Sequence, residues 1–557
     1  MSADTRETKA IETTETPLRP LWLNLAFVIK LGQAMNCHDL LQGVEVLSRS
    51  GEAALFEKTV TGVQLDSRRI EPGNLFVAMK GESTDGNRYI DAAIKAGATA
   101  VVSDSSTEHS LAELPRANVA WVRVPHGRRA LATISANFYG HPAAKLKITG
   151  VTGTNGKTTT TFLLSQVLRF LGRGEVVLIG TVEYHFAGEI IPAPHTTPES
   201  LELNRIFAKA TSSRLGKHVA SEAVMEVSSH ALHQERVYAI PFDVALFTNL
   251  TRDHLDYHRT MEEYFEAKKM LFVGCGTPPP RVAVINTDDA YGRQLAEFAY
   301  TQKSEVLTYG LENGVFRAES IRTSPQGTSF KLQTPQGTVE IRSQLVGKVN
   351  VYNMLAAATA AMARGGELQA VAKALTQARS APGRFERVDC GQPFSVVVDY
   401  AHTDDALRNV TAVARDFMAA QAKPGRVITL FGCGGDRDRS KRPLMGAAAG
   451  EGSDFVVLTS DNPRSEDPLA IIDDALPGLK KTGKRYVVEP DRHKAIALAL
   501  SEAQSGDIVL IAGKGHEKTQ TTREGVFPFD DVTVAAALLR HVRLEHARNA
   551  SHIRSTE

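Results

Sequence analysis

The sequence feature that most constrains the fold is a glycine-rich loop, Gly150-Val-Thr-Gly-Thr-Asn-Gly-Lys-Thr-Thr-Thr160. The segment 145–150 predicts a strand before it, and apolar residues at helical spacing predict a helix from Lys157. Glycines let backbone N–H groups converge on phosphate oxygens at the positive end of a helix. Lys157 suits terminal phosphates and the Thr158 hydroxyl suits Mg²⁺, although Val151 stands where the strict pattern has its first glycine. The loop therefore predicts ATP or GTP binding rather than a glycine-rich turn without a ligand.

Composition is that of an ordinary globular protein. Of 557 residues, 42% are hydrophobic and 23% are charged, which excludes a disordered chain. Lys and Arg number 64 against 63 for Asp and Glu, so no excess charge favours nucleic acid or an anionic membrane. Four cysteines without a CxxC pair disfavour a zinc ribbon or a disulfide framework. No run approaches the roughly 18 apolar residues of a membrane span, so we expect a soluble cytoplasmic protein.

Three composition units predict three α/β domains behind an N-terminal extension, residues 1–34. Short apolar runs alternate with Ala-rich helical stretches over 35–143 and, on a larger scale, over 144–382. Turns within 311–340 predict an antiparallel excursion. Over 383–557, continuous apolar runs between helices predict a parallel sheet covered on both faces. The expected fold class is α/β, with three domains and mainly parallel sheets.

Acids and histidines gather downstream of the phosphate loop. Glu226 follows a strand-like run and would complete an Mg²⁺ shell with the phosphate-loop threonine. Two Asp and two His stand within 253–258, so we interpret this segment as part of a site rather than as structural histidines. Thr260-Met-Glu-Glu263 is a capping-box pattern that predicts the start of a helix carrying Lys268 and Lys269. Composition alone would assign both lysines to a solvated helix face.

Seven short motifs occur in the order found in one enzyme family. They are Gly153-Thr-Asn-Gly-Lys-Thr-Thr159, His195-Thr-Thr-Pro198, Glu226-Val-Ser-Ser-His230, Asp253-His-Leu-Asp-Tyr-His258, Asp399-Tyr-Ala-His402, Asp461-Asn-Pro-Arg464 and Gly513-Lys-Gly-His-Glu517. The chain resembles the Mur ligases, and within them the branch that adds the third peptide residue in peptidoglycan synthesis. The likeness runs from about Leu65 to the last predicted helix.

The resemblance implies a role for each domain. The domain at 35–143 would hold the UDP-sugar, the domain at 144–382 would hold ATP, and a Rossmann-like domain at 383–557 would bring the incoming amino acid. It implies that ATP forms an acyl phosphate on the D-glutamyl side chain of UDP-MurNAc-L-Ala-D-Glu, which an amine then attacks. Because this carboxylate attacks a phosphate, Lys157 and Mg²⁺ would neutralise two anions. A monomer that binds no nucleic acid and does not insert into membranes is expected.

The resemblance also assigns residues to the nucleotide and the metal. Lys157, Lys268 and His254 would act in catalysis. Lys268, rather than Lys269, would carry a CO₂-derived carbamate that helps to hold a second Mg²⁺. From the residues alone, Asn350 and Asn353 have an alternative role as caps of a helix at 351–361. The metal ligands would be Thr158, Glu226, His254 and carbamylated Lys268, and the ATP-binding residues would be Gly153, Thr154, Asn155, Gly156, Lys157, Thr158, Thr159, Asn350, Asn353, Arg384 and Asp399.

Further residues are assigned to the other two substrates. Arg464 follows the apolar run 455–459, at a strand end where α/β sheets bind ligands. Its planar fork suits the second carboxylate of meso-diaminopimelate, which L-lysine lacks. The alternatives are an L-lysine-adding ligase, a folylpolyglutamate synthetase-like ligase and a non-catalytic nucleotide-switched binding module. The UDP-MurNAc-dipeptide residues would be Leu65, Ser67, Thr196, Thr197, Ser228, Gln234 and Arg236, and the diaminopimelate residues would be Arg437, Asp461, Asn462, Pro463, Arg464, Gly513 and Glu517.

Overall fold

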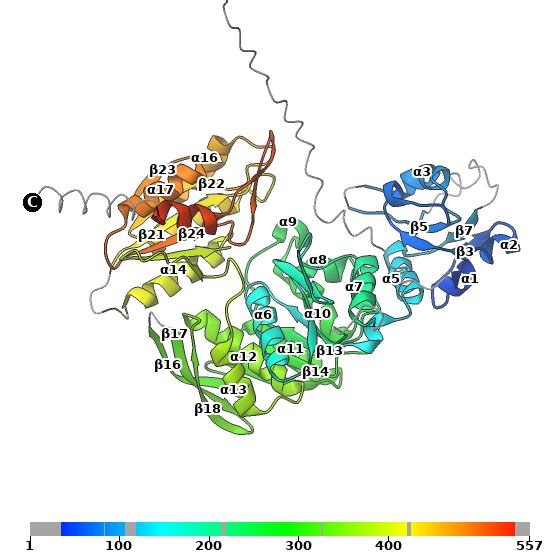
Figure 1. The fold of residues 1–557 in the computed structure, drawn as a ribbon, viewed down its shortest axis with the longest axis horizontal. Helices are drawn as coiled ribbons and strands as arrows, with labels where there is room; N and C mark the ends of the chain where they lie inside the picture. The colour runs from blue at the N-terminus through cyan, green and yellow to red at the C-terminus, as the bar shows by residue number, and fades with distance from the viewer. Residues whose placement is uncertain are drawn as a thin grey trace, which may run out of the picture.

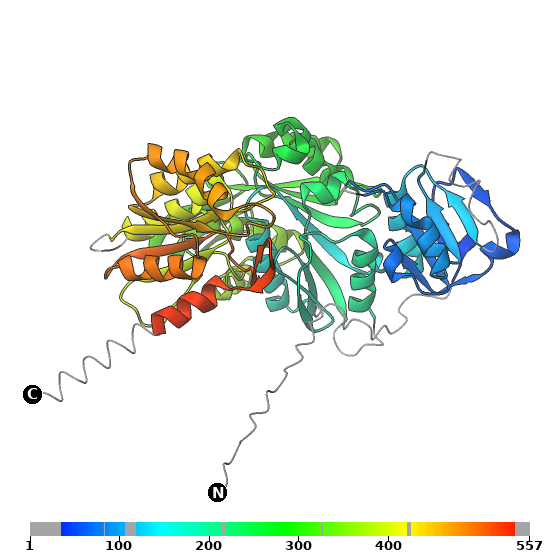
Figure 2. The same ribbon diagram turned by 90° about the horizontal axis from the view of Figure 1, so that it is seen from above.

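Three α/β domains follow one another along the chain (Figure 1). The computed structural model describes residues 35–82, 84–105, 119–212, 219–324, 327–419, 421 and 425–540, so the expected extension at 1–34 lies outside the described residues. The N-terminal and C-terminal domains lie on opposite sides of the central domain in Figure 1 and in Figure 2. Each domain is built on a mainly parallel sheet, which confirms the α/β class. The boundaries after residues 143 and 382 stay predictions.

The N-terminal domain contains a five-stranded sheet, in which only the edge strand β2 (Ser48–Ser50) runs antiparallel to its neighbour. Helix α5 (Gly127–Phe138) covers a core formed by the sheet. The sheet order is β2, β7 (Ala120–Arg123), β6 (Ala100–Ser103), β5 (Asn74–Ala78) and β4 (Gly62–Gln64). The smaller elements are β1 (Met35–Asn36), β3 (Thr59–Val60), α1 (Cys37–Leu40), α2 (Ala53–Phe56), α3 (Ile90–Lys95) and the 3₁₀ turns η2 (Ser67–Arg69), η3 (Gly86–Tyr89) and η4 (Pro142–Lys145).

The central domain contains an eleven-stranded sheet with a parallel middle and antiparallel strands at both ends. The excursion predicted within 311–340 is confirmed as three strands of one sheet end. The order is β11 (Glu189–Pro192), β10 (Glu183–Phe186), β9 (Glu175–Ile179), β12 (Ala220–Glu226), β8 (Lys147–Thr152), β13 (Phe242–Phe247), β14 (Val282–Asn286), β15 (Glu305–Gly310), β16 (Phe316–Ser324), β17 (Gly327–Thr334) and β18 (Gly337–Ser343).

Helices cover both faces of the central sheet, each over its own apolar core. One face is covered by α6 (Lys157–Phe170), α12 (Lys348–Ala363) and α13 (Leu368–Gln377). The other face is covered by α7 (Ser200–Ala210), α10 (Met261–Val273) and α11 (Ala290–Thr301), while α8 (Ser229–His233) and α9 (Leu255–His258) are short. The arrangement places the beginning of α6 at the carboxyl ends of the parallel strands, where such sheets bind ligands.

The C-terminal domain contains a six-stranded sheet that is parallel except for its first edge strand. Its order is β19 (Glu386–Arg387), β20 (Ser395–Asp399), β24 (Ile508–Ala512), β21 (Val427–Cys433), β22 (Phe455–Ser460) and β23 (Arg485–Val488). Helices α14 (Asp404–Ala419), α15 (Lys441–Gly452) and α16 (Pro468–Lys481) pack on one face, α17 (Arg492–Glu502) packs on the other, and a hairpin of β25 (Thr519–Thr522) and β26 (Gly525–Pro528) follows. This confirms the sheet covered on both faces.

A fully buried ion pair ties two strand ends of this sheet together. Arg492 Nη2 lies 2.7 Å from Asp531 Oδ2, and both side chains are fully buried. The guanidinium also donates to the carbonyl of Ser460 at 3.3 Å and to that of Ala512 at 3.0 Å. The loops that follow β22 and β24 therefore start from fixed positions.

Two helix starts test local predictions. Helix α10 begins after Thr260, whose Oγ1 accepts a 3.1 Å hydrogen bond from the Glu263 N–H, so the predicted helix start is confirmed. The Thr260 N–H donates to the His258 carbonyl rather than to the Glu263 side chain, so the reciprocal half of the capping box is not formed. Helix α12 begins at Lys348 after Gly347, with Asn350 and Asn353 inside it, so their interpretation as helix caps is wrong.

Among the helices that the structure describes, none is long and apolar enough to cross a membrane.

Candidate functional site

Two glycines of the phosphate loop adopt backbone conformations that other residues rarely adopt. Gly153 has a φ of 145° and Gly156 a φ of 84°. A Cβ at these positions would come within 1.9 Å of Thr248 Oγ1 and 2.5 Å of Asn353 Oδ1, respectively. The loop joins β8 to α6, whose first residue is Lys157. Strand, turn and helix N-terminus therefore form the predicted phosphate-binding arrangement.

Gly150 has a packing role instead. It lies inside β8, where a Cβ would come within 2.8 Å of the Phe242 ring. Val151, which stands in place of the first glycine of the strict pattern, is a fully buried strand residue. The departure from that pattern therefore falls in the strand, outside the phosphate loop.

Lys157 bonds to its own loop. Its Nζ donates to the carbonyl oxygens of Gly153 at 3.0 Å and Thr154 at 2.8 Å. Burial lowers the pKa of Lys157, and the nearby charges of Glu226 and Asp253 act in the opposite direction. The ammonium lies where the terminal phosphates are expected.

Glu226, at the end of β12, is fully buried and accepts three hydrogen bonds. The Thr158 hydroxyl donates at 3.1 Å, and Thr181 donates through its N–H at 2.8 Å and its hydroxyl at 3.1 Å. A carboxylate beside a phosphate-loop hydroxyl is an oxygen donor set that suits Mg²⁺. Within the described residues there is no group of three or more His, Cys, Asp or Glu that could hold a metal ion. A metal here would therefore also need hydroxyl, phosphate or water oxygens.

A cavity of about 310 Å³ lies between the phosphate loop and the C-terminal domain. All the residues predicted for ATP line it except Gly153. Thr196, Ser228, Glu226 and His254 line the same cavity. The motifs did not include its apolar wall, which is formed by Val349, Ala406, Val410 and Val413. The fold therefore brings the predicted nucleotide, metal and substrate residues to one place.

Arg384 fits a phosphate group in this cavity. Its guanidinium lies over the Tyr400 ring, 4.6 Å from the centroid, and Nη2 donates to Thr158 Oγ1 at 3.3 Å. Its Nε is buried and has no hydrogen-bond partner among the described residues. A guanidinium with a buried donor left over is suited to an oxyanion. The donors present therefore fit the phosphates of a nucleotide.

The other predicted ATP residues hydrogen-bond within the protein. Asn353 Nδ2 donates to Asn350 Oδ1 at 3.2 Å, and Asn350 Nδ2 donates to the Val346 carbonyl at 2.9 Å. The two oxygens of Asp399 accept backbone N–H groups at 2.7 and 2.8 Å. Carboxylate and amide groups keep further hydrogen-bonding capacity, and the roles of these residues toward ATP stay predictions.

The two adjacent lysines of α10 have different environments. Lys268 is 1% exposed, and its Nζ donates to the Gly153 carbonyl at 2.7 Å, the same oxygen that Lys157 contacts. Burial and the charge of Lys157 hold the pKa of Lys268 well below its ordinary value. Lys269 instead pairs with Glu266 on the helix surface at 3.1 Å. The structure therefore places Lys268, not Lys269, beneath the phosphate loop.

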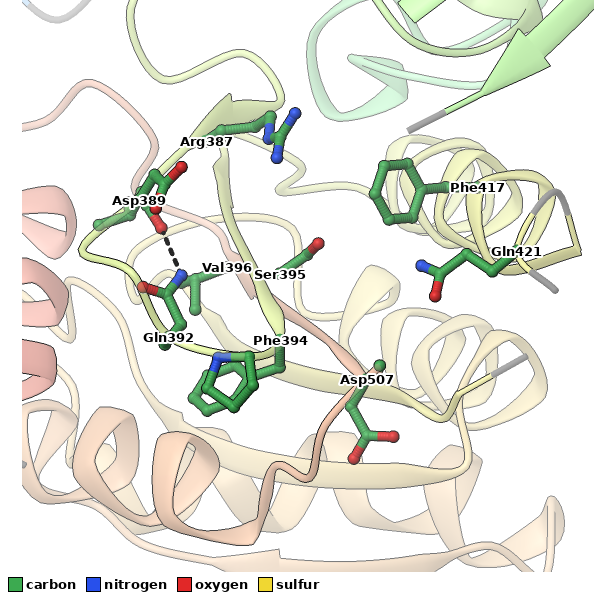
Figure 3. Close-up of a pocket in the computed structure, with 12 residues that line it drawn as sticks. Arg387, Asp389, Gln392, Phe394, Ser395, Val396, Phe417, Gln421 and Asp507 are labelled. Carbon is green, nitrogen blue, oxygen red and sulfur yellow. Dashed lines mark hydrogen bonds between the residues drawn. The ribbon is translucent and has the colours of Figure 1, made fainter. Parts of the chain in front are cut away.

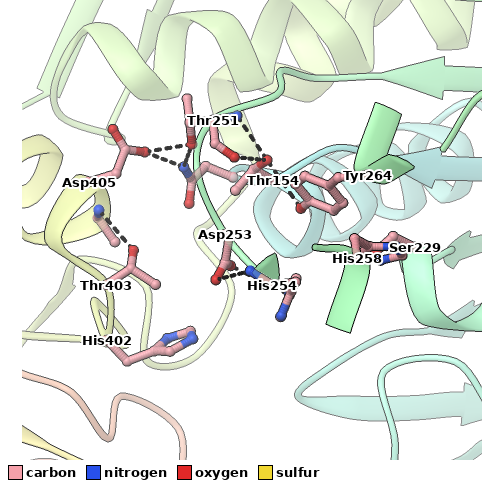
Figure 4. A network of polar contacts seen from close by, with 12 residues as sticks. Thr154, Ser229, Thr251, Asp253, His254, His258, Tyr264, His402, Thr403 and Asp405 are labelled. Atoms are coloured by element: carbon pink, nitrogen blue, oxygen red, sulfur yellow. Dashed lines mark hydrogen bonds and ion pairs between the residues drawn. The ribbon is translucent and has the colours of Figure 1, made fainter. Parts of the chain in front are cut away.

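Asp253 and His254 belong to a polar network beside the cavity (Figure 4). His254 Nε2 lies 3.4 Å from Asp253 Oδ2. Burial lowers the pKa of His254 to about 3, which keeps the ring neutral, the form in which histidine binds metals. Burial alone would raise the pKa of Asp253, but nearby positive charge, including that of Lys441, brings it below its ordinary value.

Two side chains of the C-terminal domain reach this network. Lys441, at the start of α15, forms an ion pair with Asp253. Asp405 on α14 accepts from Asn155 Nδ2 at 2.6 Å and from the Thr251 hydroxyl at 3.0 Å (Figure 4). Sequence reasoning missed both residues, because their partners stand 188 and 250 residues away along the chain. The phosphate loop and the C-terminal domain are thus joined directly.

The predicted sugar-peptide residues of the central domain form one network. Arg236 donates to Gln234 Oε1 at 2.7 Å and to the Thr197 carbonyl at 3.1 Å. The Thr197 hydroxyl accepts from the Ser228 N–H at 3.1 Å, and Thr196 lines the cavity. Of this network, Ser228 lines the cavity together with Thr196, while Thr197, Gln234 and Arg236 lie behind them in the network.

Leu65 and Ser67 lie in the N-terminal domain. Leu65 packs against its core and Ser67 begins η2. Among the described residues, no hydrogen bond or ion pair joins either to the Arg236 network. Glu82 of the N-terminal domain lies near Tyr257 and Gln234 of the central domain, and both lower its pKa against the effect of burial. The nucleotide-sugar assignment of Leu65 and Ser67 stays a prediction.

Two predicted arginines of the amino-acid site flank one glycine. Gly434 follows β21, and a Cβ there would lie 3.1 Å from Arg464 Nη1 and 3.7 Å from Arg437 Cγ. Arg464 has a φ of 53°, which non-glycine residues rarely adopt, and donates to the Gly435 carbonyl at 2.7 Å. The predicted Pro463 is buried and packs against Gly435. A Cβ at position 435 would lie 1.9 Å from the Pro463 carbonyl oxygen. The loops after β21 and β22 therefore form one surface.

The remaining predicted amino-acid residues contact one another. Asn462 Nδ2 donates to Glu517 Oε2 at 2.7 Å. Gly513 has a φ of 115°, and a Cβ there would come within 2.6 Å of Asp461 Oδ2. Tyr400 lines the cavity and also contacts this region. Its ring centroid lies 4.9 Å from that of His516, which belongs to the loop that begins at Gly513. The structure thus brings the predicted nucleotide and amino-acid sites next to each other.

A second cavity, of about 480 Å³, lies at the amino-terminal end of β20 (Figure 3). Its lining includes Arg387, Asp389, Phe394, Phe417 and Asp507. None of the predicted site residues lines it, and it lies at the end of the sheet opposite the loops that follow β21, β22 and β24. It therefore has no part in the candidate site.

Known family patterns match most of the chain. The Mur ligase family, catalytic domain, matches residues 59–139. The Mur ligase middle domain matches residues 151–361, and the Mur ligase, glutamate ligase domain, matches residues 383–515.

Curated relatives and a solved structure are similar over almost their whole length. A UDP-N-acetylmuramoyl-L-alanyl-D-glutamate--2,6-diaminopimelate ligase of Solibacter usitatus (strain Ellin6076) is 51% identical over 91% of this chain and 98% of its own. The protein of that name from Geobacillus thermodenitrificans (strain NG80-2) is 46% identical over 87% of this chain and 96% of its own. A solved structure with that name is 33% identical, with a TM-score of 0.63, and covers 92% of this chain and 100% of its own.

Proposed function

This chain belongs to the Mur ligase family, and from that premise we propose that it is an ATP-dependent ligase that adds meso-diaminopimelate to the D-glutamyl residue of UDP-N-acetylmuramoyl-L-alanyl-D-glutamate. The observation that carries the choice of amino acid is that Arg437 and Arg464 flank Gly434, and that Asn462, on the loop of Arg464, contacts Glu517 on the loop after β24. Guanidinium groups suit a carboxylate and Glu517 suits an ammonium, and the far end of diaminopimelate has both.

The first step would transfer the γ-phosphoryl group of ATP to the side-chain carboxylate of the D-glutamyl residue. A carboxylate oxygen bonds to phosphorus, the bond to the oxygen of ADP breaks, and an acyl phosphate forms. Lys157 and Arg384 supply positive charge where two anions meet. Mg²⁺, when held by Thr158 and Glu226, adds further positive charge at the phosphates.

The second step would form the amide. The amine of diaminopimelate attacks the acyl carbon, inorganic phosphate leaves, and the nitrogen loses one proton. Arg464 and Glu517 would hold the far end so that the near amine is oriented toward the cavity. The contacts of Asp405 and Lys441 across the cavity would help to exclude water from the acyl phosphate.

Lys268→Ala should lower turnover by about 100-fold, and formate or acetate should restore part of it. We infer that Lys268 is the carbamylated lysine, because it is buried beneath the phosphate loop and forms no ion pair with a carboxylate among the described residues. Only the carboxylate oxygens of the carbamate would then be missing, and a small carboxylate can replace them. Lys269→Ala is the matched control and should behave like wild type. Equal loss and rescue in both variants would mean that the wrong lysine was assigned.

An assay of phosphate release with each candidate amino acid tests the function itself. With UDP-MurNAc-L-Ala-D-Glu and ATP, we expect rapid release with meso-diaminopimelate and at least about 100-fold lower kcat/KM with L-lysine, because the lysine complex leaves polar groups unpaired. Release with L-lysine would favour a lysine-adding ligase, and glutamate addition to a folate would favour a folylpolyglutamate synthetase. ATP binding without release under any condition would favour a nucleotide-switched module. The cytoplasmic location and the monomeric state stay predictions from the sequence.

A further inference from the structure

Lys514 lies at the buried centre of the amino-acid loops, and we propose that it positions Asn462 and Glu517 for the far end of the incoming amino acid. Lys514 follows Gly513 at the carboxyl end of β24 and is 0% exposed. This inference rests on the proposed function, because Lys514 acts through two side chains assigned there to diaminopimelate. Lys514 itself is outside that assignment.

The ammonium group of Lys514 has three acceptors. Its Nζ lies 3.1 Å from Asn462 Oδ1, 2.9 Å from Glu517 Oε2 and 2.6 Å from the Thr519 carbonyl oxygen. An ammonium has three donors and no acceptor. Its hydrogen bonding is therefore complete within the protein, with no donor left for a ligand, so Lys514 is a positioning residue.

These contacts restrict both partners of Lys514. Asn462 Oδ1 also accepts from the Thr521 N–H at 2.9 Å, and Asn462 Nδ2 donates to Glu517 Oε2 at 2.7 Å. Glu517 Oε2 thus receives two hydrogen bonds, while no residue that the structure describes donates to Oε1. One carboxylate oxygen is fixed, and the other remains available for a substrate ammonium.

The same ammonium joins three chain segments: the loop after β22, the loop after β24 and the start of β25. Within β25, the Thr521 carbonyl accepts from the Arg464 N–H at 3.0 Å. The residues expected to bind the carboxylate and the ammonium of diaminopimelate therefore depend on one anchor. Removing it should weaken recognition of the far end, the part that distinguishes diaminopimelate from L-lysine.

Lys514→Met removes the ammonium and keeps most of the side-chain length. We expect the KM for meso-diaminopimelate to rise about 10-fold to 100-fold, with kcat and the KM for ATP nearly unchanged. Lys518→Met is the matched control: Lys518 lies in the same loop but is exposed, and it pairs with Asp530 at 2.8 Å. It should behave like wild type.

A second readout separates positioning from a general structural role. Positional ¹⁸O exchange in ATP, measured with UDP-MurNAc-L-Ala-D-Glu but without diaminopimelate, reports acyl-phosphate formation alone. This rate should be unchanged in Lys514→Met. A parallel fall in this rate, or an unchanged KM for diaminopimelate, overturns the proposal. If Lys514→Met does not fold, Lys514→Gln, which keeps a donor and removes the charge, is measured in the same way.

A double-mutant cycle tests whether Lys514 acts through Glu517. We expect Lys514→Met combined with Glu517→Gln to be little worse than Glu517→Gln alone, whereas additive losses contradict the proposal. Wild-type enzyme that releases no phosphate with diaminopimelate overturns the proposed function and this inference together. Wild-type enzyme that does so while Lys514→Met keeps its KM overturns this inference alone.

Discussion

Replacing Lys157 with alanine should reduce ATP-dependent ligation by about 10³-fold and leave the fold intact. The only hydrogen bonds of Lys157 among the described residues go to carbonyls of its own loop, so its removal breaks no ion pair. What is lost is the positive charge that would face the terminal phosphates while two anions react. Thr158→Ala should have a comparable effect, because its hydroxyl joins Glu226 to the expected metal position.

Phosphate release with saturating substrates measures this loss, and thermal unfolding tests the fold. Lys147→Ala is a suitable control, since Lys147 is exposed at the start of β8, the strand that leads to the loop. Unfolded Lys157→Ala protein, or turnover at the wild-type rate, would count against the phosphate-loop assignment.

Replacing Arg464 with alanine should reduce kcat/KM for meso-diaminopimelate by about 10²-fold to 10³-fold. A charge-assisted pair worth about 3–4 kcal/mol accounts for this range at about 1.4 kcal/mol per factor of ten. Arg464 is half-buried and held at Gly435, so its guanidinium is oriented before the substrate arrives. Arg464→Lys keeps the charge but loses the planar fork, and should fall between wild type and Arg464→Ala.

Steady-state kinetics with varied diaminopimelate distinguish this effect from a defect in the first step. Positional ¹⁸O exchange in ATP without diaminopimelate should be unchanged in Arg464→Ala. Arg485→Ala, an exposed arginine on β23 that pairs with Glu502, is the control and should have no effect. If the wild-type enzyme uses L-lysine as well as it uses diaminopimelate, the interpretation of Arg464 is wrong.

Local patterns predicted the elements that depend on neighbouring residues. The phosphate loop, the helix start at Thr260 and the buried strands of the C-terminal domain depend on short-range sequence, and all are found where expected. Asn350 shows the limit of such reasoning, because asparagine commonly caps helices. Here Gly347 precedes the first turn, so Asn350 lies inside α12 and bonds to Val346.

Contacts between domains could not be predicted in this way. Asp405 and Lys441 are ordinary charged residues at helix starts, and only folding brings them to Asn155 and Asp253. Lys514 belongs to the motif Gly513–Glu517, but it is buried only because the loops after β22 and β24 meet at the carboxyl ends of these strands. The choice between Lys268 and Lys269 likewise depends on which face of α10 packs beneath the phosphate loop.

Because the amino-acid site and the phosphate loop belong to different domains, the amino-acid preference can be exchanged by exchanging one domain. All the residues proposed to recognise diaminopimelate stand on loops of the C-terminal sheet, while the phosphate loop stands on the central sheet. Asp405 and Lys441 make contacts that join the C-terminal domain to the central domain, through Asn155 and Asp253. A chimaera that joins the first two domains of this chain to the C-terminal domain of another Mur ligase would therefore take the amino-acid preference of that ligase. It would also need acidic and basic residues that match Asn155 and Asp253.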